Sequence, residues 1–443
     1  MIRLPGRTAR RRMERRTECD FSFDARIAEL QSRDPAARLI GDITGLTSTF
    51  TRASVGTICS SQGMLRTMPW HMPRYHYVDL NSDGVMDEVG LLIETASQNK
   101  LLQTEGLGFA PWVPAGAGAH TAAAAVFGEL VLDQLNDNSA AALYQVTQGV
   151  TTFSFAAKKA VSFFIAQPLT GGAVSSLVLL NSSVTARGAV IVTWAAGVPV
   201  LSLINGATNA KAERWGTNEL GQVLWRISFT SATVVTAESH VLYIYPATDS
   251  QYAVANTGAM LFGGVQVEES PVATSYMKSG ASYGFRALDV CYFDWLGVGR
   301  PLSVFVDLLD ITGFDGRATY WSFSPTTTPR LWAIADNGGF YGIYNNNTAG
   351  AAQSTASGVA NPRDRIKARV ILHPDGHVTA GWSINAAAET VNSAASTIGL
   401  SKVAFGTPRL HLGEVSNGGA ILLFRVKVVS SVSYSLAQLD ALP

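Results

Sequence analysis

The chain has 443 residues, enough for two or three domains at roughly 150 residues each, and each domain could bury a hydrophobic core. Lys plus Arg and Asp plus Glu both total 33, so the whole chain has no field that would steer it toward nucleic acid or an anionic membrane. Cys19, Cys59 and Cys291 are too few and too scattered for a disulfide framework or a zinc cluster, and we expect free thiols. Only 15% of the residues are charged while small and β-branched residues abound, which predicts an all-β protein.

Residues 1–48 are predicted to form an extended basic arm. Seven arginines lie within residues 1–16, without the apolar stretch that a secretory signal requires. We expect the arm to anchor the protein by docking on an acidic neighbour; a solvated tail and a contact with nucleic acid are the alternatives, and the short length disfavours the second. A short helix is predicted over residues 24–32, ended by Pro35. The candidate assembly residues are Arg10, Arg11, Arg12, Arg15 and Arg16.

Residues 49–109 are predicted to be an irregular connector that packs against the next domain. Pro69, Pro73 and several glycines interrupt its short apolar pieces. His71 and His76 lie beside tyrosines, with no cysteine or second histidine pair to join them, so ordinary polar surface is the better interpretation.

One turn of this connector matches a calcium-binding loop at the first, third, fifth and sixth positions. Calcium takes about six to eight oxygen ligands, and the loop usually obtains two from a glutamate at its twelfth position, which here is Gly90. The alternative is an Asx-rich turn whose side chains bond only the backbone. If an ion binds, its expected role is structural, and no other cofactor is expected. The candidate ligands are Asp79, Asn81, Asp83 and Asp87.

Two series of strands are predicted after the connector, one in residues 110–290 and one in residues 291–443. Apolar and polar residues alternate over residues 224–229, which is typical of a sheet with one buried face. The uncharged run 188–208 approaches the length of a membrane span, but Gly197 and Pro199 interrupt it, and a hairpin of residues 189–194 and 198–204 is the better prediction. We therefore expect two antiparallel, jelly-roll-like β-sandwiches behind the arm and connector. Strands are predicted at 152–157, 161–166, 176–180, 223–230, 240–245, 302–309, 319–324, 330–335, 340–344, 366–372, 377–384 and 421–429, and a helix with a capping box at residue 435.

A succession of short landmarks resembles the phage head spike and tail fibre family. They are Phe50-Thr51-Arg52-Ala53-Ser54, Leu65-Arg66-Thr67, Pro73-Arg74-Tyr75, Gly90-Leu91-Leu92-Ile93-Glu94, Asn99-Lys100-Leu101-Leu102, Thr152-Phe153-Ser154-Phe155, Leu224-Trp225-Arg226-Ile227, Phe262-Gly263-Gly264-Val265-Gln266-Val267-Glu268 and Ala273-Thr274-Ser275-Tyr276. The resemblance covers about residues 49–290. It implies a carbohydrate-binding-module-like jelly roll over residues 110–290 in a virion appendage, and residues 291–443 resemble a concanavalin-type or laminin-G-like sandwich.

Three tryptophans on predicted strands of the last domain are candidate glycan-binding residues: Trp321, Trp332 and Trp382. An exposed indole can stack on a sugar ring, whose CH groups meet the electron-rich face. The alternative is that each tryptophan fills the sandwich core, since aromatic side chains dominate core burial.

The leading hypothesis is a non-enzymatic structural protein of a tailed bacteriophage virion. We found no nucleophile elbow, metalloprotease helix, phosphate loop or converging carboxylate pair, so no catalytic residue is proposed. The arm would anchor a head spike, head fibre or tail fibre to capsid, portal or tail proteins, and the sandwiches of a homo-oligomer would contact host surface polysaccharide. The alternatives are a decoration protein that stabilises the particle without binding sugar and, less favoured, a polysaccharide depolymerase.

Overall fold

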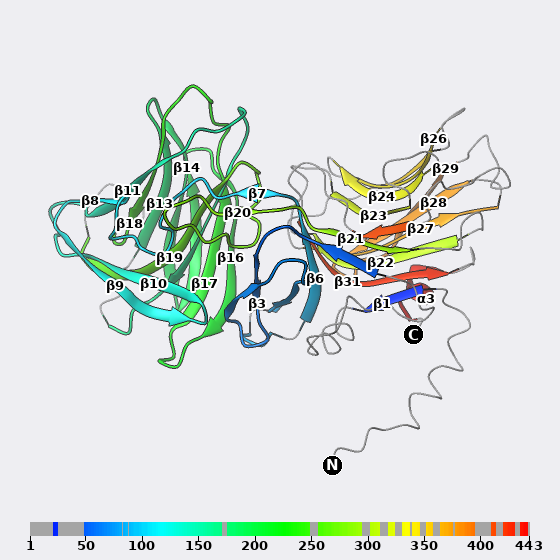
Figure 1. Cartoon of the computed structure of the whole chain (residues 1–443), viewed down its shortest axis with the longest axis horizontal. Helices are drawn as coiled ribbons and strands as arrows, with labels where there is room; N and C mark the ends of the chain where they lie inside the picture. The colour runs from blue at the N-terminus through cyan, green and yellow to red at the C-terminus, as the bar shows by residue number, and fades with distance from the viewer. Residues whose placement is uncertain are drawn as a thin grey trace, which may run out of the picture. The chain divides into compact units, whose positions relative to one another are not determined.

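The computed structural model describes residues 21–24, 48–81, 83–86, 88–170, 175–248, 256–294, 302–310, 318–323, 330–336, 339–345, 351–357, 364–374, 377–394, 409–412, 420–429 and 435–441 (Figure 1). Strands account for 58% of the structure and helix for 2%, which confirms the predicted all-β class. Unit 1 comprises Met1–Thr51, Gly90–Glu94 and Asp289–Pro443, and unit 2 comprises Arg52–Val89 and Thr95–Leu288.

The range 49–109 is not the irregular connector that we expected, because it contains several strands. Two of them, β2 (Ser48–Thr51) and most of β6 (Glu88–Glu94), belong to unit 1. Unit 2 holds β3 (Gly56–Cys59), β4 (Leu65–Met68), β5 (Tyr75–Val78) and β7 (Ser97–Gln98), the last paired with β20 (Phe285–Arg286). The apolar residues 91–93 are fully buried. Their buried backbone N–H and C=O groups need hydrogen-bond partners, which the neighbouring strands of a sheet provide.

Unit 2 is built on two six-stranded antiparallel sheets. The order in the first sheet is β16 (Thr208–Thr217), β17 (Val223–Thr230), β12 (Ala160–Ala166), β19 (Gly258–Glu268), β10 (Leu130–Asp137) and β9 (Gly118–Phe127). The order in the second is β15 (Val198–Ile204), β14 (Ala186–Ala195), β13 (Ser175–Ser182), β18 (His240–Tyr245), β11 (Gln145–Val150) and β8 (Val113–Ala115).

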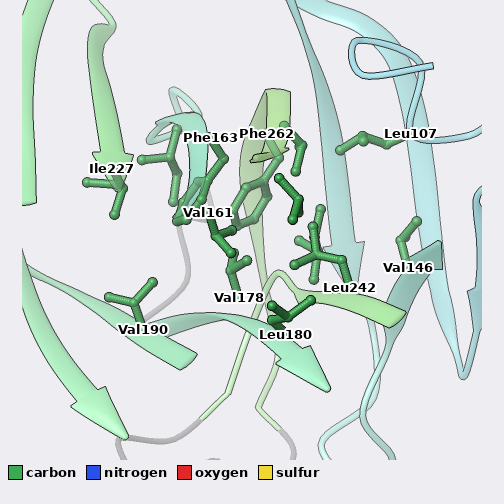
Figure 2. Close-up of a cluster of buried hydrophobic side chains, with 14 of the residues drawn as sticks. Leu107, Val146, Val161, Phe163, Val178, Leu180, Val190, Ile227, Leu242 and Phe262 are labelled. Carbon is green, nitrogen blue, oxygen red and sulfur yellow. The ribbon is translucent and has the colours of Figure 1, made fainter. Parts of the chain in front are cut away.

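Alternate residues of both sheets form one core, shown in Figure 2. Val161 and Phe163 from the first sheet lie in the same cluster as Val178, Val190 and Leu242 from the second, and all are fully buried. The period of two places these side chains on the facing surfaces of a sandwich.

The first sheet is also covered on its outer face. Phe164, from the opposite face of β12, packs with Cys59 and Leu65 of the β3–β4 hairpin and with Trp215. Burial on both faces explains why the sequence of β12 is almost continuously apolar instead of alternating.

The uncharged run 188–208 forms the predicted hairpin, β14–β15. Its two-residue turn is Ala196-Gly197, both at positive φ (50° and 80°). The pair Ala195–Val198 closes the turn, so the next pair, Trp194–Pro199, is not hydrogen-bonded, and the nitrogen of Pro199 faces away from β14. Proline therefore removes no ladder bond from this edge strand. Among the residues that the structure describes, no helix is long and apolar enough to cross a membrane.

One predicted strand of unit 2 is wrong. Residues 152–157 form a loop, in which Ser154 N donates to Glu269 Oε1 (2.7 Å) and the carbonyl of Phe155 accepts from Lys159 Nζ (3.0 Å). These side-chain bonds replace the sheet partners that the alternation alone suggested.

Unit 1 is a second pair of antiparallel sheets. One has the order β2, β21 (Val290–Asp294), β30 (Arg409–Leu412), β23 (Ala318–Phe323), β24 (Arg330–Asp336), β25 (Gly339–Asn345) and β26 (Ala351–Ser357). The other has β29 (Thr390–Ala394), β28 (Val378–Ile384), β27 (Arg365–Leu372), β22 (Leu302–Asp310) and β31 (Ala420–Val429), and β31 also pairs with β6 and β1 (Phe21–Asp24). All the strands predicted in this range are present. The terminal helix α3 (Leu436–Ala441) begins with the predicted capping box, in which Ser435 N donates to Gln438 Oε1 (2.8 Å) and Gln438 N to Ser435 Oγ (3.2 Å).

Candidate functional site

The tryptophans proposed for glycan stacking do not form a site. Trp321 on β23 is fully buried, and Trp382 on β28 is 2% exposed, so neither indole offers a face to a sugar. Both side chains fill the core of unit 1, which is the alternative that the sequence left open, and both candidates are corrected. The side chain of Trp332 on β24 lies outside the described part of the chain.

The predicted calcium turn is held together by its own hydrogen bonds. Asp79 accepts from the backbone nitrogens of Asp83 (3.1 Å) and Gly84 (2.7 Å), and Asp83 accepts from Val85 N (2.8 Å) and Asn81 Nδ2 (3.0 Å). These bonds are those of an Asx-rich turn, with Gly84 at φ 95°.

The surroundings of this turn do not favour a cation. A Cβ at Gly84 would lie 2.0 Å from Nη1 of Arg214, so a guanidinium already packs against the loop. Asp87 is outside the described residues, and within them no group of three or more His, Cys, Asp or Glu side chains has metal-site geometry.

The predictions for the basic arm and for the cysteines have different outcomes. The candidate assembly residues Arg10, Arg11, Arg12, Arg15 and Arg16 and the thiol Cys19 lie outside the described residues. So does the helix predicted over residues 24–32, except for Asp24, which is wrong as a helical residue because it ends strand β1. Cys59 and Cys291 are buried free thiols, as predicted, and burial raises the pKa of Cys291.

His76 does not lie on the surface, contrary to what the sequence suggested. It is 8% exposed, its Nδ1 accepts from Cys59 N (3.2 Å), and its ring meets the ring of Trp215 edge-on at a centroid distance of 5.9 Å.

Four of the nine landmarks of the family resemblance contribute residues to one buried arginine cluster in unit 2. We use this name for Arg74, Arg226, Arg286, Gln266, Glu268, Thr274 and Ser275. Arg286 donates to Thr274 Oγ1 (2.8 Å), Ser275 Oγ (3.1 Å) and the carbonyl of Thr95 (2.6 Å), and Arg74 donates to the same Ser275 Oγ (2.8 Å). Both arginines are fully buried. One serine thus joins segments about 200 residues apart in the chain.

Glu268 supplies the negative charge of the buried arginine cluster. It is fully buried and accepts from Ser97 Oγ (2.6 Å), Thr274 N (2.9 Å) and Gln266 Nε2. Arg226 completes the cluster by donating to the carbonyl of Thr274 and to Ser162 Oγ (3.2 Å). A buried charge is tolerated only when its partners are in place, and here the protein itself supplies them.

Asn99 fastens the same region to β19. Its Nδ2 donates to the carbonyls of Val265 (3.1 Å) and Met277 (3.2 Å), and its Oδ1 accepts from Val267 N (3.1 Å) and Leu101 N (3.2 Å). All four bonds of the amide are used, which an aspartate or a leucine could not reproduce. The polar groups of these residues therefore form hydrogen bonds that stabilise the fold.

A second group of ionisable residues lies at one end of the unit 2 sandwich, and no sequence pattern predicted it. His240 is 3% exposed, and burial lowers its pKa. Its ring meets Phe153 at 5.0 Å, and the Arg187–Glu238 ion pair (2.5 Å) and the buried Lys159 influence its charge. Burial lowers the pKa of Lys159 as well.

Two open hollows lie on unit 2. One, of about 550 Å³, includes Met64, Val126 and Leu220, and the other, of about 510 Å³, includes the amides of Gln134 and Asn136. Gln134 Nε2 donates to Asn136 Oδ1 (2.9 Å), so these amides partly satisfy each other. Neither hollow gathers the residues that the sequence analysis selected.

Comparison with known proteins adds little to this geometry. No family model matches the chain, and no curated protein matches it. Among solved structures, domains LG4-5 of the mouse laminin alpha1 chain are similar, with 11% sequence identity over 68% of this chain and 89% of that chain, at a TM-score of 0.22. A likeness at this level supports no conclusion about the site.

Proposed function

We propose that the chain is a structural protein of a tailed bacteriophage virion, an appendage anchored by its basic N-terminal arm. The observation that carries the proposal is the buried arginine cluster, because four of the landmarks behind the resemblance to head spikes and tail fibres contribute residues to it. Their role in holding the fold explains why such landmarks would recur in an appendage, whatever each appendage binds.

The cluster also suits a part that must keep its shape under load. Arg74, Asn99, Glu268 and Arg286 tie the segment before the sandwich to the segment after it through bonds shielded from water. Breaking any of them leaves buried polar groups without partners, so the unit should resist partial opening. Contact with host surface polysaccharide is the second part of the proposal.

The test is electron microscopy of purified phage particles with a gold-labelled antibody against this chain. Labels on outward projections would support the proposal, and labels absent from the particle would overturn it. Particles assembled with a chain that lacks residues 1–20 should lose the label while the free protein, which keeps strand β1, still folds. Particles that fall apart without the protein but show no projection would instead favour a decoration protein.

A further inference from the structure

We infer that the turn Pro69-Trp70-His71-Met72 of unit 2 presents Trp70 as a stacking platform for a sugar ring of a host surface polysaccharide. The inference rests on the proposed function, since it names a contact point for the polysaccharide. It concerns a residue that the sequence analysis did not select, on the loop between β4 and β5.

Trp70 differs in its exposure from five other tryptophans that the structure describes. Its side chain is 62% exposed, whereas Trp112, Trp215, Trp225, Trp321 and Trp382 are exposed by 4% or less. Burial of apolar surface stabilises a protein by roughly 25 cal/mol per Å², and an indole left in water lacks this stabilisation. A large, exposed aromatic side chain on an ordered turn is therefore available to stack on a ligand.

The turn has a strained backbone that its surroundings maintain. Met72 N donates to the carbonyl of Pro69 (3.4 Å), and His71 has φ 58°, the left-handed value that the third position of a type II turn requires. Glycine is usual at that position, so histidine needs compensation. The compensation is local: His71 N donates to the carbonyl of Arg52 (3.1 Å), and Arg52 N donates to His71 Nδ1 (3.2 Å).

The guanidinium of Arg52 locks the same turn from inside. Arg52 is 1% exposed, and it donates to the carbonyls of Pro69 (2.7 Å), Met72 (3.3 Å) and Met68 (3.4 Å). Its Nε donates to the carbonyl of Ser54 (2.8 Å), which fixes the arginine itself. Because the turn is ordered before any ligand arrives, binding would forfeit little conformational entropy.

The chemistry around the indole suits a sugar better than a protein. Exposed residues with hydrogen-bonding side chains precede and follow Trp70 in the sequence. They are Arg66, Thr67 and His71. A sugar ring offers CH groups to the indole face and hydroxyls to such neighbours. A protein partner of standard size would bury about 800 Å² on each side around an apolar centre, far more than one turn provides. The π face of an indole attracts positively polarised hydrogens, which the CH groups of a sugar provide.

The experiment uses the full chain on a printed array of bacterial capsular and O-antigen polysaccharides, followed by titration of the best polysaccharide by calorimetry. Trp70→Ala should weaken binding by about tenfold or more, and Trp70→Phe, which keeps an aromatic face, by less. Phe109→Ala is the matched control, because Phe109 is also an exposed aromatic residue (60%) on a loop of unit 2. Its affinity should stay at the wild-type value.

Unchanged affinity in Trp70→Ala, or no binding to any polysaccharide, would overturn the inference. Thermal unfolding of each variant checks the fold, and an exposed residue such as Trp70 should leave it unchanged. Particle labelling separates the two proposals. If glycan binding depends on Trp70 but no label appears on particles, only the virion assignment is overturned. If particles are labelled but glycan binding does not depend on Trp70, only the proposed role of Trp70 is overturned.

Discussion

The two units hold their charged residues in different ways. In unit 2 the buried arginine cluster is sealed: Arg74, Arg286 and Glu268 are fully buried, and the arginines donate to neutral oxygens of Thr95, Thr274 and Ser275. In unit 1, Asp307 is also fully buried, but its partners Arg365 (2.9 Å) and Arg425 (2.6 Å) keep 29% and 26% of their side chains in water. The first arrangement depends on hydrogen-bond geometry and the second on charge, so pH and salt should act on them differently.

Arg425 extends the unit 1 arrangement to helix α3. It also contacts Asp440 (2.7 Å), which in turn accepts from Lys367 (2.6 Å). Burial raises the pKa of Asp440, yet Lys367 and Arg425 lower it by more, and the net shift is downward. This network should therefore persist until the pH is well into the acid range.

The largest expected effect is that of Arg286→Ala. The change leaves Thr95 O and Thr274 Oγ1 without this buried donor and removes one of the two arginine donors to Ser275 Oγ, and we expect the free energy of unfolding of unit 2 to fall by about 4 kcal/mol. Urea unfolding followed by tryptophan fluorescence measures it. Arg66→Ala, at an exposed position of β4, is the control and should change stability by about 0.5 kcal/mol at most. Equal losses in the two variants would contradict a sealed cluster.

Asp307→Asn should destabilise unit 1 by about 2 kcal/mol, less than a sealed pair would lose, because water already reaches Arg365 and Arg425. This loss of stability should become smaller as the salt concentration is raised, because salt screens the attraction between charges that water reaches. The loss in Arg286→Ala should not depend on salt in this way. Chemical denaturation by urea at low and high sodium chloride tests the difference. A loss that does not depend on salt would indicate that Asp307 acts by geometry, as the unit 2 cluster does.

Asp83→Ala should cost about 1 kcal/mol in unit 2, because Val85 N and Asn81 Nδ2 lose their acceptor. The wild-type melting temperature should be the same with calcium and with a chelator, as expected for a turn held by its own hydrogen bonds. A calcium-dependent rise that disappears in Asp83→Ala would restore the calcium site.

The smallest effect concerns His240, whose pKa burial lowers in the folded state. As the pH falls below about 6.5, the unfolded chain takes up this proton before the folded chain does, so the stability of unit 2 should decrease. His240→Gln should flatten the pH dependence between about pH 6.5 and 5, where carboxylates do not yet titrate. The measurement is the urea midpoint as a function of pH. An unchanged slope in the variant would assign the effect to another group.

Prediction from the sequence succeeded where the signal is local. Residues 366–370 alternate in the way a half-buried strand must, the Ala196-Gly197 turn supplies positive φ, and the box at Ser435 caps a helix. It failed where side chains from distant segments compete with that pattern. Residues 152–157 alternate like a strand, yet Lys159 and Glu269 hold them as a loop.

The sequence by itself determined the all-β class, the hairpins and thirteen of the strands, because the formation of strands and tight turns follows from periodicity and turn chemistry within about ten residues. Only the tertiary structure decided which polar residues are free to act. Tryptophan is equally able to fill a core or to meet a ligand, and burial separated Trp321 and Trp382 from Trp70. Likewise, Arg52 and Arg74 resemble surface arginines in the sequence, and only the packing of segments far apart in the chain buries them among carbonyl and hydroxyl oxygens. Burial depends on the whole fold, so no local pattern encodes it.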